Sequence, residues 1–146
     1  ASLPESVAAR LGESGQRLLK ANREEALEAE LRASFGHLLD ANVDIVLGTD
    51  AGAVPDHFFG YTGHRELEIF VRLGMTPMQA IVAATSKPAQ RLGLDDLGLL
   101  QPGYSADLVV LDENPLNNIR NTRSISLVFL NGKMLDRAGL AADFTQ

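Results

Sequence analysis

The sequence contains no cysteine. A chain without thiols forms no disulfide, has no cysteine nucleophile and offers no thiolate to a metal ion. The absence favours a cytoplasmic protein, although a signal peptide that has been removed would leave no trace in the sequence. Any metal bound by this chain would therefore be held by histidine, aspartate or glutamate side chains.

Aromatic residues and positive charge are also scarce. Aromatic residues make up 5% of the 146 residues, tryptophan is absent, and 13 Lys and Arg stand against 19 Asp and Glu. Nucleic-acid surfaces rely on stacked aromatic rings and on cations that neutralise phosphates, so we expect no nucleic-acid partner. No apolar run is long enough to cross a bilayer, so we expect no membrane partner either.

What is present is an ordinary globular composition. Hydrophobic residues make up 45% and charged residues 22%. The length suits one domain with a sizeable core. The sequence has no internal repeat and no low-complexity segment, so motifs and their spacing have to indicate the function.

The most informative stretch begins at residue 43. A run of mostly apolar, β-branched residues from Val43 to Leu47 leads into Gly48, Thr49 and Asp50. This pattern predicts a buried parallel strand that ends in a polar turn. Enzymes built on parallel sheets and barrels place their chemistry at this end of a strand. The carboxylate of Asp50 could there bind a metal or transfer a proton, or it could simply cap the following turn.

Two histidines follow in a loop rich in glycine and proline, residues 51–65. His57 and His64 could ligate a metal, contact substrate or carry protons, and the plainer alternative is that each makes a local hydrogen bond. The third histidine, His37, lies near the end of a helix predicted over 22–41 and is interpreted as a surface or half-buried helix residue and not as a ligand. A helix that leads directly into a strand indicates an α/β unit.

The remaining pattern divides the chain into two regions. Residues 1–93 read as α/β layers. They include a short helix opened by Pro4, a loop at 12–15, a helix over 65–73, and a capping box of Thr76, Pro77 and Gln79 that begins a further helix. Pro88 predicts a break in that helix, and Gly93 ends its second piece. Residues 94–146 read as a small antiparallel β unit. It has short strands at 97–100 and 106–112, a type I′ hairpin at Asn131-Gly132 and an irregular tail.

The order of motifs resembles a known family. The series runs Gly48-Thr49-Asp50, His64-Arg65-Glu66-Leu67, Gly74-Met75-Thr76-Pro77-Met78-Gln79-Ala80, Ala83-Ala84-Thr85-Ser86-Lys87-Pro88-Ala89, Gly93-Leu94, Leu97-Gly98 and Pro102-Gly103-Tyr104-Ser105-Ala106-Asp107-Leu108-Val109-Val110-Leu111-Asp112. Over roughly residues 36–135 the chain resembles the C-terminal part of the amidohydrolase superfamily. The similarity is greatest to its imidazolonepropionase-like and prolidase-like branch.

The resemblance implies a metal-dependent hydrolase on a (β/α)8 barrel, with a small β-sandwich built from both chain ends. Residues 1–93 would be the last βα units of the barrel and residues 94–146 part of the sandwich. Asp50 matches the aspartate at the end of the last barrel strand, which implies that it binds the catalytic metal and acts as general base. His64 matches a histidine near the substrate.

The same resemblance implies the cofactor and the substrate class. The cofactor would be a divalent metal, with zinc favoured, as one or two ions. The reaction would be hydrolysis of a C–N bond in a small molecule or dipeptide, such as a cyclic amide, an N-acyl amino acid or a dipeptide. Carboxylate and imidazole groups that converge from different strands are what such a metal requires.

The family's other metal ligands have no counterpart in this sequence. The His-x-His of the first strand, the bridging Lys or Glu of the middle strands and two further strand histidines are missing, and only three histidines occur. A complete barrel takes about 250 residues. We therefore interpret the chain as a C-terminal fragment, inactive alone, that self-associates or pairs with the missing N-terminal part.

Two other interpretations stay open. The chain could be a non-catalytic α/β domain used for binding or assembly. It could also be an enzyme of another class that uses Asp50 and His64 as an acid and base pair.

Overall fold

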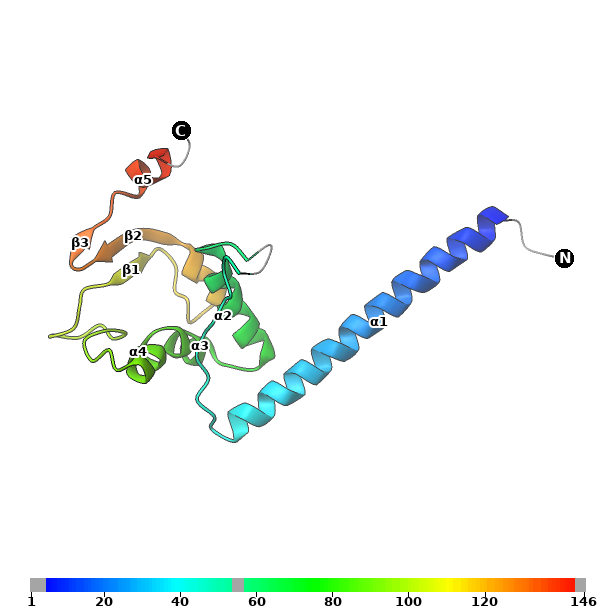
Figure 1. The fold of residues 1–146 in the computed structure, drawn as a ribbon, viewed down its shortest axis with the longest axis horizontal. Coiled ribbons are helices and arrows are strands. Elements are labelled where there is room, and N and C mark those ends of the chain that lie inside the picture. Colours follow the sequence, from blue (N-terminus) through cyan, green and yellow to red (C-terminus); the bar gives the residue numbers. More distant parts are fainter. Residues whose placement is uncertain (1–4, 54–56, 144–146) are drawn as a thin grey trace. The chain divides into compact units, whose positions relative to one another are not determined.

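A computed structural model of the chain describes residues 5–53 and 57–143. The chain forms two compact units, one that ends at Asn42 and one that begins at Val43. The first unit is a single helix and the second holds all other elements (Figure 1). Helices and a small antiparallel sheet make the chain an α/β protein, as the sequence predicted.

The first unit consists of α1 (Glu5–Asp40). The prediction of a helix confined to 22–41, preceded by a loop at 12–15, was wrong, because the helix runs through Gly12 and Gly15. An isolated glycine costs a helix only about 1 kcal/mol relative to alanine, and the neighbouring Ala, Leu, Arg and Gln residues are strong helix formers. Among the described residues, no helix combines the length and the hydropathy needed to cross a membrane.

The strand predicted over 43–47 is the main correction. The structure assigns no strand to residues 43–50, although their side chains alternate between exposed and partly buried. A strand needs neighbouring chains that exchange backbone hydrogen bonds along its length. Segment 43–49 is joined to a neighbouring element by a backbone hydrogen bond from the Leu47 N–H to the carbonyl of Ala83, at 2.9 Å. The parallel partner that would make this segment a strand is not in the described chain. The predicted burial is also only partial, because Val43 and Val46 are 46% and 42% exposed.

Ion pairs fix the same segment to the helices. Asp44 pairs with Lys87 at 3.4 Å between Nζ and Oδ1, and also with Arg91. All three side chains are at least one-third exposed, so these pairs orient the segment more than they stabilise the fold.

Three helices follow, α2 (Tyr61–Leu73), α3 (Pro77–Ala84) and α4 (Ser86–Leu92). The capping box at the start of α3 is confirmed. Thr76 Oγ1 accepts from the Gln79 N–H at 3.2 Å, and Gln79 Oε1 accepts from the Thr76 N–H at 2.8 Å. Gly93 ends α4 in the left-handed conformation with φ 70°, as predicted.

The sheet has three antiparallel strands in the order β1 (Leu108–Leu111), β2 (Ile125–Leu130) and β3 (Lys133–Met134). A 3-10 helix, η1 (Ile119–Arg123), lies in the connection between β1 and β2. The predicted type I′ turn is confirmed by φ values of 50° at Asn131 and 74° at Gly132. The division into barrel and sandwich parts at residue 93 stays a prediction.

Two smaller predictions near the C-terminus were wrong. Residues 97–100 form no strand, and the tail contains a helix, α5 (Arg137–Asp143). Asp136 starts this helix because its Oδ1 accepts a hydrogen bond from the Gly139 N–H at 3.0 Å. An aspartate in that position is a strong N-cap.

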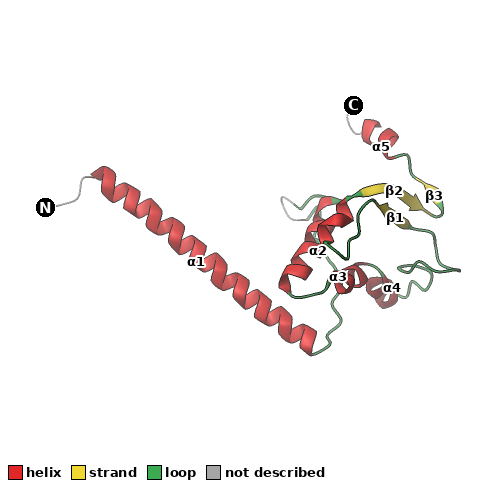
Figure 2. Ribbon diagram, turned by 180° about the vertical axis from the view of Figure 1, so that it is seen from behind, coloured by secondary structure: helices red, strands yellow, loops and turns green. Residues whose placement is uncertain are grey.

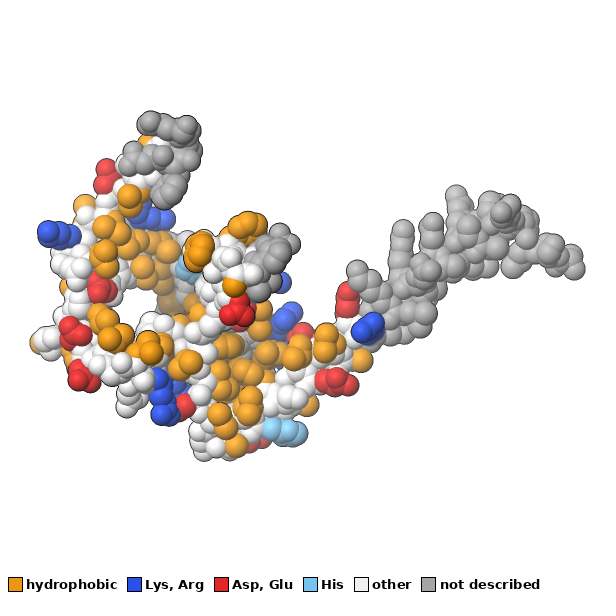
Figure 3. Space-filling model, in the orientation of Figure 1, with side chains coloured by type: hydrophobic (Ala, Val, Ile, Leu, Met, Phe, Trp, Pro, Cys, Tyr) orange, Lys and Arg blue, Asp and Glu red, His pale blue; other side chains and the backbone are white. Residues whose placement is uncertain are grey.

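The core of the second unit lies between α2, α3 and η1. Its buried apolar side chains are Leu67, Phe70, Leu73, Met75, Ala80, Ala83, Ala89 and Ile119. Figure 2 shows the sheet on one side of this unit, α3 and α4 on the other, and α2 at one end. Many apolar side chains of the sheet are not buried, and Figure 3 shows such side chains around a hollow in the surface.

Gly98 packs against the junction of α3 and α4 and provides a test of this packing. A Cβ atom at Gly98 would lie 2.7 Å from the carbonyl oxygen of Thr85 and 2.8 Å from the Cα of Ser86. Gly103 has a similar positive φ, 94° against 82°, but a Cβ there meets nothing within 4 Å. Gly98→Ala should therefore add a steric clash to the backbone strain that both substitutions share.

We expect Gly103→Ala to lower the free energy of unfolding by about 1–2 kcal/mol, the cost of a left-handed L-residue. We expect Gly98→Ala to lower it by about 1–3 kcal/mol more, the cost of overpacking. Urea unfolding of both variants measures the difference. Equal losses would show that Gly98 is needed only for its backbone conformation.

Candidate functional site

Asp50 lies in an exposed turn that follows segment 43–49. Its φ is 49°, a left-handed value that aspartate and asparagine tolerate better than other L-residues. Two hydrogen bonds fix the turn, from Ala51 N–H to Thr49 Oγ1 at 3.2 Å and from Ala53 N–H to the Asp50 carbonyl at 3.0 Å. Within the part of the chain that the structure describes, the Asp50 carboxylate has no hydrogen bond or ion pair. It is therefore accessible to a ligand.

His57 holds this turn in place. Its Nδ1 lies 2.7 Å from the carbonyl oxygen of Thr49, and because a carbonyl only accepts, Nδ1 carries a hydrogen and donates it. The Gly52 N–H donates in return to the carbonyl of His57 at 3.1 Å. These two bonds tie the loop after Asp50 back onto the residue before it. His57 thus makes the local backbone hydrogen bond that the sequence analysis kept as the alternative to a ligand role.

His64 lies in α2, and its hydrogen-bond partner lies in η1. Its Nδ1 is 3.0 Å from the hydroxyl oxygen of Thr122 in η1. The single hydroxyl proton of Thr122 is donated to the carbonyl of Ile119 at 2.9 Å. The Thr122 oxygen must therefore accept from His64, so Nδ1 carries the hydrogen. Among the described residues, no hydrogen bond or ion pair joins His64 to Asp50.

The electrostatic surroundings of His64 favour the neutral ring. Burial lowers the pKa of His64 below its ordinary value of 6.5, the nearby Arg123 guanidinium lowers it further, and the Glu68 carboxylate partly opposes them. A neutral imidazole whose Nδ1 is protonated has an unprotonated Nε2. At neutral pH, Nε2 of His64 is thus a hydrogen-bond acceptor.

An ion-pair network joins η1 to α2 beside His64. Glu68, whose side chain is 16% exposed, pairs with Arg120 at 3.3 Å between Nε and Oε2, and also with Arg123. The Arg123 guanidinium carbon lies 4.9 Å from the centroid of the Tyr61 ring, within the range of a cation–π contact. These contacts fix the position of η1 along α2. The hydrogen bond between Thr122 and His64 depends on that position.

His64 lines an apolar cavity of about 320 Å³. The wall comes from α2, from α3 and its C-cap, from β1 and β2 and from the segment that connects these strands. The residues are His64, Leu67, Ile81, Ala84, Thr85, Val109, Leu111, Pro115, Thr122 and Ile125. Asp50 is not among them, so the structure does not bring the two predicted site residues to one cavity.

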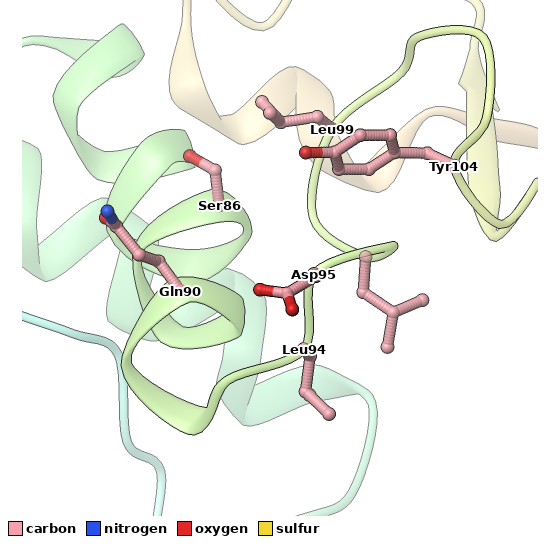
Figure 4. Close-up of a pocket in the computed structure, with 7 residues that line it drawn as sticks. Ser86, Gln90, Leu94, Asp95, Leu99 and Tyr104 are labelled. Carbon is pink, nitrogen blue, oxygen red and sulfur yellow. The ribbon is translucent and has the colours of Figure 1, made fainter.

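A second cavity, of about 420 Å³, lies between α4 and the loop that follows it (Figure 4). Asp95 and Tyr104 of the loop extend toward Ser86 and Gln90 of α4. Neither Asp50 nor His64 lines it. This cavity is therefore separate from the predicted site.

The described residues do not make a complete metal site. Among the residues that the structure describes, there is no group of three or more His, Asp or Glu side chains that could hold a metal ion. An exposed carboxylate such as Asp50 is chemically suited to a divalent cation, but a catalytic zinc takes three protein ligands. Asp50 could thus contribute to a metal centre and could not form one with its described neighbours.

Sequence reasoning missed Thr122, which sets the tautomer of His64. The two residues are 58 positions apart, and a threonine in a polar connection carries no pattern that predicts such a contact. The signal that could have drawn attention to it is local, because Asn118 and the residues after it form a 3-10 turn capped by the Asn118 side chain.

The lowered pKa of His64 gives the stability of the protein a specific pH dependence. The unfolded chain binds a proton at His64 more readily than the folded chain does. The contribution of His64 is therefore present above pH 6.5 and is lost as the pH falls through the lower, folded pKa. Urea unfolding between neutral and mildly acid pH should show stability falling on acidification, with a shallower fall for His64→Gln.

His37→Gln is the matched control because it also removes one histidine but leaves His64 and its contacts unchanged. This variant should keep the part of the pH dependence that His64 contributes. If His64→Gln kept it as well, the folded and unfolded states would bind protons equally at His64.

Comparison with known proteins supports one family. The family model for the amidohydrolase family matches residues 5–135. An ochratoxinase from Aspergillus niger is 33% identical over 139 residues, which cover 89% of this chain and 28% of that protein. An imidazolonepropionase from Cutibacterium acnes is 44% identical over 75 residues, 51% of this chain and 18% of that protein.

A solved structure agrees with these sequence relatives. A Xaa-Pro dipeptidase structure with bound methionine in its active site matches with a TM-score of 0.64 and 32% identity, over 71% of this chain and 25% of that one. The chain thus spans about a quarter of the length of these relatives. The match over most of the described residues shows that this chain belongs to the amidohydrolase family.

Proposed function

We propose that this chain supplies the catalytic carboxylate and a substrate contact to a metal-dependent hydrolase of C–N bonds. The substrate class is a cyclic amide, an N-acyl amino acid or a dipeptide. The observation that supports the proposal is the placement of Asp50, which lies in the motif shared with the family, on a turn fixed by Thr49 and His57, with its carboxylate exposed. The names of the relatives, which include a dipeptidase and an imidazolonepropionase, agree with this substrate class.

In this proposal each residue has one chemical role. Asp50 accepts a proton from the attacking water and then delivers it to the leaving nitrogen, as a positioned carboxylate can. His57 keeps the turn rigid, so that the carboxylate holds its position during proton transfer. His64 contacts the substrate through Nε2, the ring nitrogen that Thr122 leaves available.

Asp50 is also proposed as one ligand of a divalent metal, zinc in the first instance, as one or two ions. Such a metal supplies Lewis acidity that activates water and polarises the scissile carbonyl. The described residues form no cluster of three ligands, and the family's other ligand motifs have no counterpart in this sequence, so the proposal takes the remaining ligands from a longer polypeptide. The chain alone should then be inactive.

A second candidate is a non-catalytic binding or assembly domain. The lack of a three-ligand cluster in the described residues favours it over an enzyme for the isolated chain. The two proposals make different predictions for a longer polypeptide. Only the hydrolase proposal predicts that hydrolytic activity appears once the other metal ligands are present.

The carboxylate of Asp50 provides the test of the first proposal. In a longer polypeptide that carries this chain and the remaining family ligands, Asp50→Asn should lower kcat for an N-acyl amino acid or dipeptide by about 10²–10⁴-fold, the usual contribution of general acid–base catalysis. Asparagine tolerates the same left-handed backbone, so the fold should persist. Asp112→Asn, at an exposed position just after β1, is the matched control and should keep kcat unchanged.

The isolated chain completes this experiment. We expect the purified chain of 146 residues to show no zinc-dependent hydrolysis of the same substrates. Turnover by this chain alone would contradict the need for outside ligands.

We further propose that the chain self-associates, or pairs with a polypeptide that completes the barrel and sandwich, through its sheet. In the described sheet, β1 is an edge strand, and Val109 and Val110 on it are 51% and 38% exposed. An apolar edge strand tends to pair with another chain. Further exposed apolar side chains on β2 and β3 extend this surface.

Light scattering should therefore detect a species larger than the monomer. Val110→Lys should shift the population toward monomer, because a lysine on an edge strand opposes pairing. Leu116→Lys is the control, since it charges an exposed apolar position outside the sheet. A monodisperse wild-type monomer at high concentration would refute self-association.

A further inference from the structure

The cavity between α4 and the loop that follows it has a wall of mixed character (Figure 4). Its volume of about 420 Å³ lies within the usual range of small-molecule sites, roughly 300–1,000 Å³. The wall consists of four polar side chains and three leucines, which are Ser86, Gln90, Asp95 and Tyr104 with Leu94, Leu97 and Leu99. Such a wall suits a ligand that has one polar end and one apolar end.

Backbone contacts hold this loop against α4. The Leu94 N–H donates to the carbonyl of Ala89 at 2.9 Å, at the end of the helix. Gly98 packs against the junction of α3 and α4, where a Cβ atom would lie 2.7 Å from a backbone carbonyl oxygen. The Ser105 N–H donates to the carbonyl of Asp96 at 2.8 Å, which joins the end of the loop to its start. The loop is therefore held in this shape by its own contacts, and a ligand need not order it on binding.

The polar side chains of this wall are available to a ligand. Among the residues that the structure describes, none of the four makes a hydrogen bond or an ion pair through its side chain. Figure 4 shows the Asp95 carboxylate and the Tyr104 hydroxyl extending from the loop toward α4, on which Ser86 and Gln90 lie. A ligand between the loop and the helix would therefore meet both groups of the loop.

Asp95 determines the charge that the ligand should carry, because it is the charged side chain of the wall. The cations of α4, Lys87 and Arg91, pair with Asp44 and do not line the cavity. An ionised carboxylate only accepts hydrogen bonds, and the oxygen of the Tyr104 hydroxyl can accept one as well. A primary ammonium group has a positive charge and three N–H donors, so it can satisfy both acceptors.

We propose that this cavity binds a small primary amine in its ammonium form. The ammonium group donates to the Asp95 carboxylate and to the Tyr104 hydroxyl oxygen, and the carbon chain packs against the leucines of the wall. The Asp95 side chain is exposed, so its attraction for the cation is modest. Neither Asp50 nor His64 lines the cavity, so this inference does not rest on the proposed hydrolysis.

n-Butylamine and n-butanol test the proposal, because they have nearly the same shape and differ in charge and in the number of donors. Butylamine is protonated at neutral pH, as a lysine side chain is. At low ionic strength, where screening is weakest, we expect it to bind this chain about 3- to 10-fold more tightly than butanol. NMR titration measures both affinities, and amide shifts in α4 and in residues 94–104 locate the site.

Two asparagine variants then identify the carboxylate. Asp95→Asn removes the charge from the wall and keeps the shape of the side chain, so butylammonium should lose its advantage over butanol. Asp96→Asn is the matched control, because it removes the same charge from an adjacent residue that does not line the cavity. This control should keep the preference.

Tyr104→Phe tests the second acceptor. It removes only the hydroxyl, and it should lower the affinity for butylammonium by about 2- to 5-fold. The inference fails if butanol binds the wild-type chain as tightly as butylammonium does, or if the shifts lie outside α4 and the loop. It also fails if Asp95→Asn and Asp96→Asn weaken binding equally, since that result would show only a general attraction to a chain of net charge -6.

Discussion

The contact between α2 and η1 determines how the second unit is arranged. Glu68 is mostly buried and pairs with two arginines of η1, and a buried carboxylate needs such partners. Because η1 lies between β1 and β2, fixing it against α2 also fixes one end of the sheet against the helices. The cavity wall, the orientation of Thr122 and the tautomer of His64 all follow from that one contact.

The two candidate residues depend on different parts of the chain. Asp50 is placed by local bonds, to Thr49, Ala53 and the loop that His57 ties back. His64 is placed by Thr122, which is distant in sequence. Each candidate residue therefore has its own structural support. A change that loosens η1 would disturb His64 and leave the Asp50 turn as it is.

Local chemistry was predictable from the sequence, and long-range pairing was not. The capping box at Thr76, the Asn131-Gly132 turn and the left-handed glycine after α4 depend on a few adjacent residues, and all three are confirmed. The strand at 43–47 failed because its pattern describes a face toward a core, whereas a strand also requires neighbours. Asp50 became a candidate through its local motif, whereas Thr122 and the cavity depend on contacts between residues far apart in sequence.

His64 sits between opposite charges, and this has a consequence for its behaviour in different buffers. Arg123 lowers the pKa of His64 and Glu68 raises it, and added salt screens both interactions. Burial is the largest influence on the ring and is not screened by mobile ions. Ionic strength should therefore alter the charge state of His64 far less than it would for a histidine governed by one neighbouring charge.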